Sequence, residues 1–153
     1  MAYKFRLQKV LDVKEKEEDN KKNEMSLVNF EIEKAKKQLT ELYDELEENY
    51  KYRQDKNSNG SSIQELLELN KYIDYLKNTA IRQKIEEIDI LQKNLEGKKE
   101  EFIDIRRQRK SYENLKDKDY HKFLEKESKD EEKIIYEIVS FTARKNKIGR
   151  AHV

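Results

Sequence analysis

Apolar residues at alternating intervals of three and four are the feature that most constrains this chain. Such spacing is the heptad pattern of a helix that packs an apolar seam against another helix. One seam lies before residue 56 and another after residue 62, and none of the 153 residues is a proline, which would break a long helix. The first seam is Met25, Val28, Ile32, Ala35, Leu39, Leu42 and Leu46, and the second begins Leu66, Leu69, Ile73, Leu76 and Ala80. The pattern predicts an all-α chain of long coiled-coil helices.

The highly charged composition leaves a disordered polymer as the alternative to a helical rod. Asp, Glu, Lys and Arg make up 44% of the residues and the hydrophobic set only 35%, a composition also found in disordered chains. The regular apolar spacing favours helices. The formal net charge of +1 disfavours a nucleic-acid-binding hairpin.

The segment Lys14–Glu24 has no apolar residue. We interpret it as a solvated part of a long helix held by i,i+4 ion pairs, with a flexible stretch of the coil as the alternative.

A short cluster of Asn, Ser and Gly separates the two periodic segments. Residues 56–62 read KNSNGSS, and such residues mark a turn. Gly60 can take the left-handed conformation that ends a helix, and Ser62 with Glu65 has the spacing of a capping box. We therefore predict a long antiparallel two-helix coiled-coil hairpin that is monomeric. The alternative is one continuous bent helix that pairs with a second chain.

The expected hairpin forms one domain with a C-terminal overhang. Folding about the turn places Val28 near Leu91 and Leu7 near Tyr112, and it leaves residues beyond about Lys118 without a partner from the first arm. The expected bounds are 1–147 for the domain, 2–56 for the first arm, 57–61 for the turn and 62–147 for the second arm.

Two places in the second arm depart from a plain heptad. Ala80 to Ile88 is one residue longer than a heptad, and Ile81 and Ile85 fill the gap, so we expect a local irregularity of the supercoil there. Gly97 lies inside the apolar pattern, which continues past it, so it should not end the helix.

The last six residues, IGRAHV, do not continue the seam. We expect Gly149 to break the helix. One codon choice for residues 148–153 spells part of a widely used sequencing adapter. We interpret the segment as a non-native tail. The alternative is an ordinary basic tail.

Several classes of function lack the residues they need. There is no Cys, the two histidines His121 and His152 lie far apart, and the three glycines are scattered. Neither a metal site nor a cofactor is therefore expected. No sequence feature implies a cleft that would perturb a carboxylate pair, so we expect no catalytic residue and no enzyme. No apolar run has the length of a signal peptide or a membrane span, which predicts a cytoplasmic protein.

A face near the start of the second arm is the best candidate for a binding site. Tyr72, Leu76, Thr79 and Gln83 follow one another at steps of four, three and four, which places them on one side of a regular helix. Tyr72 and Tyr75 are amphipathic side chains of the kind that protein interfaces use. The alternative is that they shield the seam near the turn.

Two stretches resemble the flagellar FliJ proteins of Gram-positive bacteria. The opening MAYKFRLQKVLDVKEKEED is similar to the start of that family, with an aromatic-basic stretch, a Leu-rich turn of helix and a charged run. LNKYIDYLKNTAI, after the Gly/Ser break, resembles the start of the family's second helix. The resemblance covers roughly residues 1–147.

The resemblance implies a role in flagellar type III protein export and hence in flagellum biogenesis and motility. It implies a stalk-like coiled coil whose terminal end inserts into the ring of the export ATPase, promotes assembly of the ring and couples it to the membrane export gate. It also implies that the chain escorts export chaperones and is held peripherally at the cytoplasmic face of the cell membrane through the gate.

Positions of this sequence can be assigned to these roles. The resemblance places the gate-docking face at Tyr72, Leu76, Thr79 and Gln83, although Thr79 and Gln83 are more polar than the family pattern. The unpaired apolar stripe and the basic residues near it suggest the ring contact. The residues expected to contact the ATPase ring are Phe5, Leu7, Leu11, Ile134, Ile138 and Phe141. The same coiled-coil pattern also fits a structural tether in another assembly without an ATPase partner.

Overall fold

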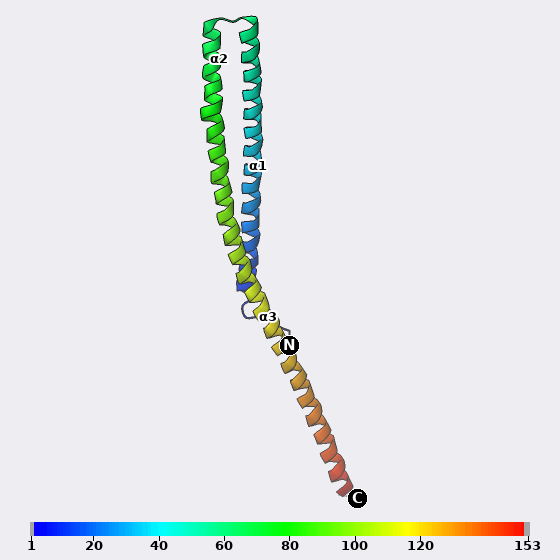
Figure 1. The fold of residues 1–153 in the computed structure, drawn as a ribbon. Helices are drawn as coiled ribbons and strands as arrows, with labels where there is room; N and C mark the ends of the chain where they lie inside the picture. The colour runs from blue at the N-terminus through cyan, green and yellow to red at the C-terminus, as the bar shows by residue number, and fades with distance from the viewer. Residues whose placement is uncertain (1, 152–153) are drawn as a thin grey trace. The chain divides into compact units, whose positions relative to one another are not determined.

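The chain is helical over most of its length. The computed structural model describes residues 2–151, and Figure 1 draws them as long helices joined by one short turn. Helix α1 covers Gln8–Asn59, α2 covers Ile63–Tyr75, a π-helical turn η1 covers Leu76–Ala80, and α3 covers Ile81–Ala151. The all-α prediction is confirmed. The first helix starts at Gln8 rather than Ala2, because residues 2–7 form a non-helical segment that packs on α3.

The turn between α1 and α2 uses the residues that the sequence marked for it. Gly60 has a φ of 86°, the left-handed conformation that ends a helix at little cost only for glycine. The Ser62 hydroxyl caps α2 by accepting a hydrogen bond from the Glu65 N–H at 3.1 Å. The Glu65 carboxylate accepts from the Ser61 hydroxyl at 2.7 Å. The turn begins only after Asn59, so α1 ends three residues later than the expected first arm.

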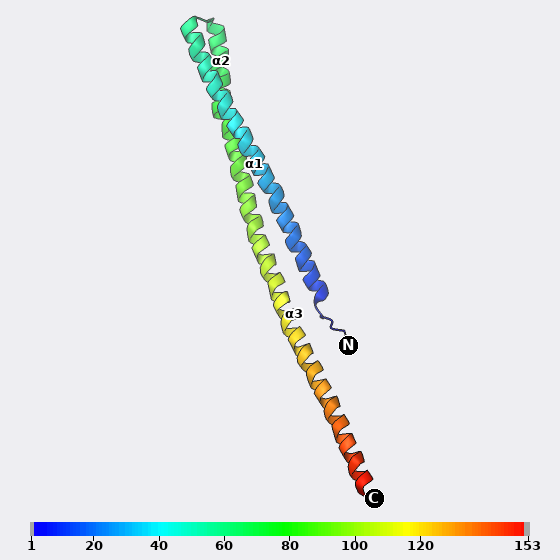
Figure 2. The same cartoon turned by 90° about the vertical axis from the view of Figure 1, so that its right-hand side faces the viewer.

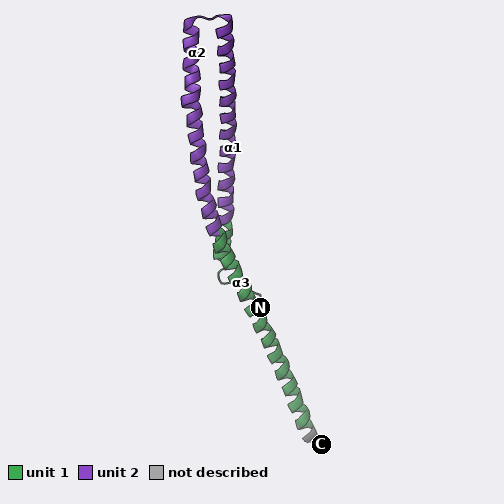
Figure 3. Cartoon of the chain, viewed as in Figure 1, with its two compact units in different colours: residues 1–16, 106–153 green, residues 17–105 purple. Residues whose placement is uncertain are grey.

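Residues 17–105 form one of two compact units of the chain (Figure 3). In this unit α1 runs antiparallel to α2, η1 and the first part of α3, and Figures 1 and 2 both show the two arms joined at the turn. Val28, Ile32 and Leu95 form a buried cluster, and Met25 and Leu91 pack against it. The hairpin is therefore confirmed, and Leu91 packs against the buried cluster that holds Val28.

The π-helical turn η1 keeps the buried seam continuous. Leu76 and Ile81 are 1% and 5% exposed, although they stand five residues apart in a chain whose other seam steps are three or four. The N–H of Ile81 donates to the carbonyl of Leu76, which is the five-residue bond of a π-helix. If the helix were an unbroken α-helix, Gln83 would face α1 in place of Lys84. Ile81 and Ile88 would then be rotated out of the seam. The predicted irregularity exists, but it lies at Leu76–Ala80, just before the expected place.

Residues 1–16 and 106–153 form the second unit, described here by itself (Figure 3). Leu11 is 2% exposed. The ring of Tyr3 packs against Tyr120 and Phe123 of α3, with centroids 5.0 and 5.3 Å away. The expectation that residues beyond Lys118 have no partner from the first arm is therefore wrong. The partner is the non-helical segment before α1, which a helix-only pairing scheme does not consider.

Helix α3 continues past both of its glycines, Gly97 and Gly149. Gly97 lies inside the helix, as expected. Gly149 does too, since α3 runs to Ala151, so the expected helix break is wrong. His152 and Val153 lie outside the described residues, and the origin of the tail at 148–153 stays a prediction. Over residues 2–151, none of the helices combines the length and the apolar character needed to cross a membrane.

Candidate protein-docking sites

Two stacked tyrosines lie on the outside of α2, near its C-terminal end. Tyr72 and Tyr75 are 41% and 52% exposed, and their rings stack with centroids 6.2 Å apart and planes 25° apart. The Tyr72 hydroxyl donates a hydrogen bond to the Glu45 carboxylate of α1. This bond and partial burial raise the pKa of the Tyr72 phenol, because both favour its neutral form. The pair is thus held in a defined orientation with much of its surface open to a partner.

The four residues predicted for this face do not lie on one exposed surface. Leu76 is 1% exposed and belongs to the core, Thr79 is half-buried, and Gln83 is exposed. Lys84, next to Gln83, faces α1, because its ammonium donates to the Gln38 side chain at 2.8 Å. The exposed residues here are Tyr72, Tyr75 and Gln83, and the half-buried Thr79 lies beside them. We define these four residues as the tyrosine face.

The sequence indicated Tyr75 beside Tyr72, but the predicted set of four omitted it because their spacing assumed a regular helix through η1. In a regular α-helix each residue turns by about 100°, so steps of four, three and four return to one side. One extra residue in the π turn rotates everything beyond it by about one such step relative to Tyr72. A spacing of eight residues across the turn, from Tyr75 to Gln83, then corresponds to two full turns. The signal in the sequence was the eight-residue step from Ala80 to Ile88.

The segment before α1 is anchored on α3 through Tyr3. Its hydroxyl donates to the Asp119 carboxylate at 3.0 Å and also lies 3.4 Å from the Lys116 carbonyl oxygen. Burial against the aromatic rings of α3 and the bond to Asp119 raise the pKa of the Tyr3 phenol. The anchor fixes where Phe5 and Leu7 lie.

A groove lined by both apolar and charged side chains lies beside this anchor. Phe5, Leu7 and Leu115 line it together with Arg6, Asp119 and two lysines, and its volume is about 450 Å³. Phe5 and Leu7 are half-buried, so part of each remains accessible, whereas Leu11 is core.

The apolar stripe near the C-terminal end of α3 is open. Ile134, Ile138 and Phe141 are 56%, 59% and 69% exposed. We use the name terminal surface for two separate parts of this unit taken together: the groove residues Phe5 and Leu7, and the stripe Ile134, Ile138 and Phe141. It holds the predicted ring-contact residues other than the buried Leu11.

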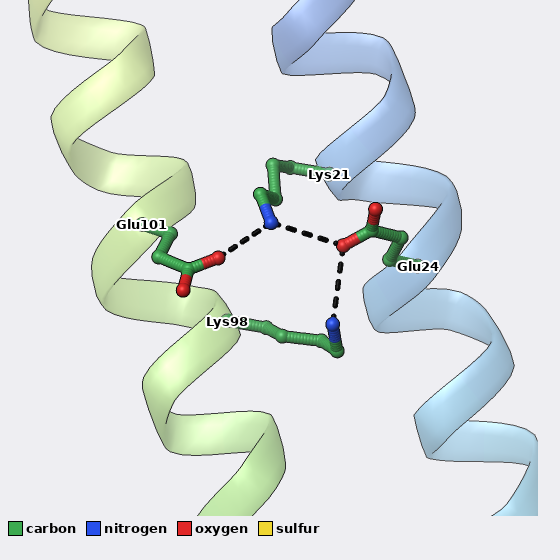
Figure 4. Close-up of polar contacts among 4 residues, drawn as sticks. All are labelled: Lys21, Glu24, Lys98 and Glu101. Carbon is green, nitrogen blue, oxygen red and sulfur yellow. Dashed lines mark hydrogen bonds and ion pairs between the residues drawn. The ribbon is translucent and has the colours of Figure 1, made fainter.

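A cluster of four charges takes the place of an apolar layer between α1 and α3 (Figure 4). Lys21 lies 2.5 Å from Glu101 and 3.1 Å from Glu24, and Lys98 lies 3.1 Å from Glu24. The bonds from Lys21 and Lys98 lower the pKa of the Glu24 carboxyl, and those to Glu101 and Glu24 raise the pKa of the Lys21 ammonium. The stretch Lys14–Glu24 is accordingly a helical part of the hairpin.

Across residues 2–151, no group of three His, Cys, Asp or Glu side chains could hold a metal ion. The surfaces described above are aromatic, apolar and charged, which is the chemistry of protein docking.

Comparison with known families decides the identity of the chain. The model of the family described as "Flagellar FliJ protein" matches residues 3–147. The chain belongs to the flagellar FliJ family. The "Flagellar FliJ protein" of Bacillus subtilis (strain 168) is 27% identical over 124 residues, which cover 80% of this chain and 83% of the relative. No solved structure matches the chain.

Membership of the FliJ family makes this chain a component of flagellar protein export. FliJ proteins are non-catalytic structural components of the export apparatus, so the chain is not an enzyme. Its partners belong to that apparatus.

Proposed function

We propose that this FliJ-family chain is a stalk-like coiled coil that couples the export ATPase to the membrane export gate. Its terminal surface inserts into the ATPase ring and promotes assembly of the ring. Its tyrosine face docks on the cytoplasmic region of the gate, and this contact holds the chain peripherally at the membrane. The chain also escorts export chaperones.

The observation that carries the ring contact is the open apolar stripe of α3. Ile134, Ile138 and Phe141 are each more than half exposed. An isolated chain gains nothing by exposing three large apolar side chains in one stripe, and such stripes usually mark a binding surface. Arg144 and Lys145 follow the stripe and add positive charge to it. A protein partner that covers the stripe accounts for both features.

The support for the gate contact is the exposed tyrosine pair. Tyr72 and Tyr75 are pre-organised by their own stacking and by the bond from Tyr72 to Glu45. Tyrosines held in this way bind with little loss of side-chain entropy, which is why they are frequent at interface hot spots.

The proposed mechanism depends on the shape of the chain, and no chemical step takes place on the chain itself. A helical rod within an asymmetric ring makes different contacts with different subunits. It therefore favours one subunit state over another by the difference in contact free energy. No atom of the chain needs to touch the nucleotide, and hydrolysis belongs to the ATPase.

The ring contact is tested with Ile138→Glu and a matched control. Ile138 is 59% exposed in the stripe, and Ile90, which is 60% exposed, lies elsewhere on α3. Ile138→Glu should abolish stimulation of the export ATPase, whereas Ile90→Glu should leave it unchanged. A chain that ends at Lys126 keeps the Tyr3 anchor and removes the stripe, and it should also fail to stimulate. Full stimulation by both the Ile138 variant and the shortened chain would refute the ring contact.

A further inference from the structure

Three adjoining hollows lie around the segment before α1. The groove beside the Tyr3 anchor is one of them, and the other two have volumes of about 380 and 470 Å³. Among the described residues, Asp119 is the one acidic residue that lines them, and it already accepts a hydrogen bond from the Tyr3 hydroxyl. Seven cationic residues line the same hollows, and we call them the cationic set. They are Lys4, Arg6, Lys9, Lys116, Lys118, Lys122 and Lys126.

The side chains of the cationic set have no partner within the described chain. Over residues 2–151, none of them forms an ion pair or a side-chain hydrogen bond, whereas Lys21, for example, is paired with Glu101. Asp117 and Glu125, the other acidic residues of this part of α3, line none of the three hollows. The formal net charge of the whole chain is only +1, so this concentration of unpaired positive charge is local.

Apolar side chains lie among these cations. Phe5 and Leu7 are half-buried in the groove, and Leu115 beside them is 48% exposed. Phe123 is half-buried and lines a second hollow. A ligand that matches both features has a large apolar side chain for the groove and several carboxylates for the cations around it. Matched charges of this kind attract a partner and also fix its orientation.

We propose that the three hollows bind an acidic segment of the export ATPase that carries an apolar anchor residue. The anchor enters the groove beside Phe5 and Leu7, and carboxylates on either side of it pair with the cationic set. This inference rests on the proposed contact of the terminal surface with the ATPase ring, and it adds the chemistry of the segment that the ring contributes. It accounts for the gathering of unpaired cations at the place where the segment before α1 is anchored.

Two other anionic partners match these hollows less well. A helix that binds a lipid surface lays an open apolar face into the membrane, whereas Phe5 and Leu7 are half-buried in a hollow. A site for single-stranded nucleic acid stacks bases on open aromatic rings, whereas the ring of Tyr3 packs against Tyr120 and Phe123. The recessed apolar residues therefore favour a peptide, because one of its side chains can reach them.

Lys118→Glu combined with Lys122→Glu tests the proposal. Both side chains are exposed and line the groove. The double variant should bind the purified export ATPase at least about tenfold more weakly, because reversal replaces close attractive pairs across the interface by repulsion. The matched control is Lys22→Glu combined with Lys37→Glu, which makes the same change of charge at exposed positions of α1. Its affinity should stay within about twofold of that of the natural chain, and both variants should keep the natural melting temperature to within a few degrees.

Carbodiimide cross-linking locates the partner segment directly, since the reagent joins a lysine to a carboxylate that it contacts. In the complex of the full chain with the ATPase, Lys118 and Lys122 should be joined to Asp or Glu residues that flank an apolar residue. Cross-links from Lys22 and Lys37 without any from the cationic set would overturn the inference.

Ile138→Glu and the chain that ends at Lys126 separate failure of this inference from failure of the ring contact. If they lose ATPase stimulation while the double lysine variant binds the ATPase normally, only the acidic segment is refuted. If both stimulate fully and the double lysine variant also binds normally, the ring contact falls and this inference falls with it. Phosphatidylglycerol vesicles and a single-stranded oligonucleotide are the remaining probes. Binding of either probe that the double lysine variant loses, with its ATPase binding unchanged, would assign the hollows to that partner instead.

Discussion

Truncation of Leu76 separates the core of the hairpin from its docking surface. Leu76 is 1% exposed and lies in the seam between Ile73 and Ile81. Leu→Ala at such sites costs about 2–5 kcal/mol, because the removed methyl groups leave a cavity that relaxes only in part. With about 3 kcal/mol as the central value, a chain of this size should melt roughly 10 °C lower. Thermal unfolding followed by circular dichroism measures the shift.

Tyr72→Ala is the matched control, one turn away on the same helix. Tyr72 is 41% exposed, and its truncation removes one hydrogen bond to Glu45. The substitution should therefore lower the free energy of unfolding by about 1 kcal/mol or less. Urea unfolding of both variants gives the two free energies directly. A smaller loss of unfolding free energy for Leu76→Ala than for Tyr72→Ala would refute the assignment of Leu76 to the core and of Tyr72 to the surface.

Three further predictions concern the anchor, the charge cluster and the turn. Tyr3→Phe keeps the ring contacts and loses the hydrogen bond, so it should lower stability less than Tyr3→Ala in thermal melts. Because the pKa of Glu24 is lowered in the folded chain, its carboxylate stabilises the fold at pH values above the ordinary pKa of 4.5. This contribution is lost as the pH falls through the lowered pKa. Because the pKa of Lys21 is raised, its ammonium stabilises the fold at pH values below the ordinary pKa of 10.5. This contribution is lost as the pH rises through the raised pKa. Melts across pH should show both losses, and Glu24→Gln should flatten the acid side. Gly60→Ala should cost about 1 kcal/mol, because alanine is strained at a φ of 86°, whereas Gly97→Ala should stabilise by up to about 1 kcal/mol in chemical denaturation.

The sequence predicts the hairpin because each of its determinants is local or periodic. The heptad spacing around Val28 and Leu95 needs only helix geometry to specify a seam. Gly60 and Ser62 act through their own backbone and side chain, so their roles in the turn could be assigned without a structure.

The exposed surfaces are harder to predict, since they depend on how an irregularity is absorbed. The extra residue before Ile88 was visible in the sequence, but a supercoil distortion and a π turn were equally compatible with it. Only the structure shows that the residue is absorbed in η1, which brings Gln83, beyond the turn, into line with Tyr75. Leu76 lies at the start of the turn and is core because it continues the seam from Ile73. The Tyr3 anchor has no periodic signal, because it joins a non-helical segment to residues far along the chain.

The central claim is that this FliJ-family chain carries two separate docking surfaces. The most direct test is to measure gate binding and ATPase stimulation on one preparation of Tyr72→Ala combined with Tyr75→Ala. Loss of an interface anchor costs about 2 kcal/mol or more, so affinity for the gate should fall by at least about thirtyfold. Stimulation of the ATPase should be unchanged, because the terminal surface is intact. A joint loss of both activities, or unchanged gate binding, would contradict the account.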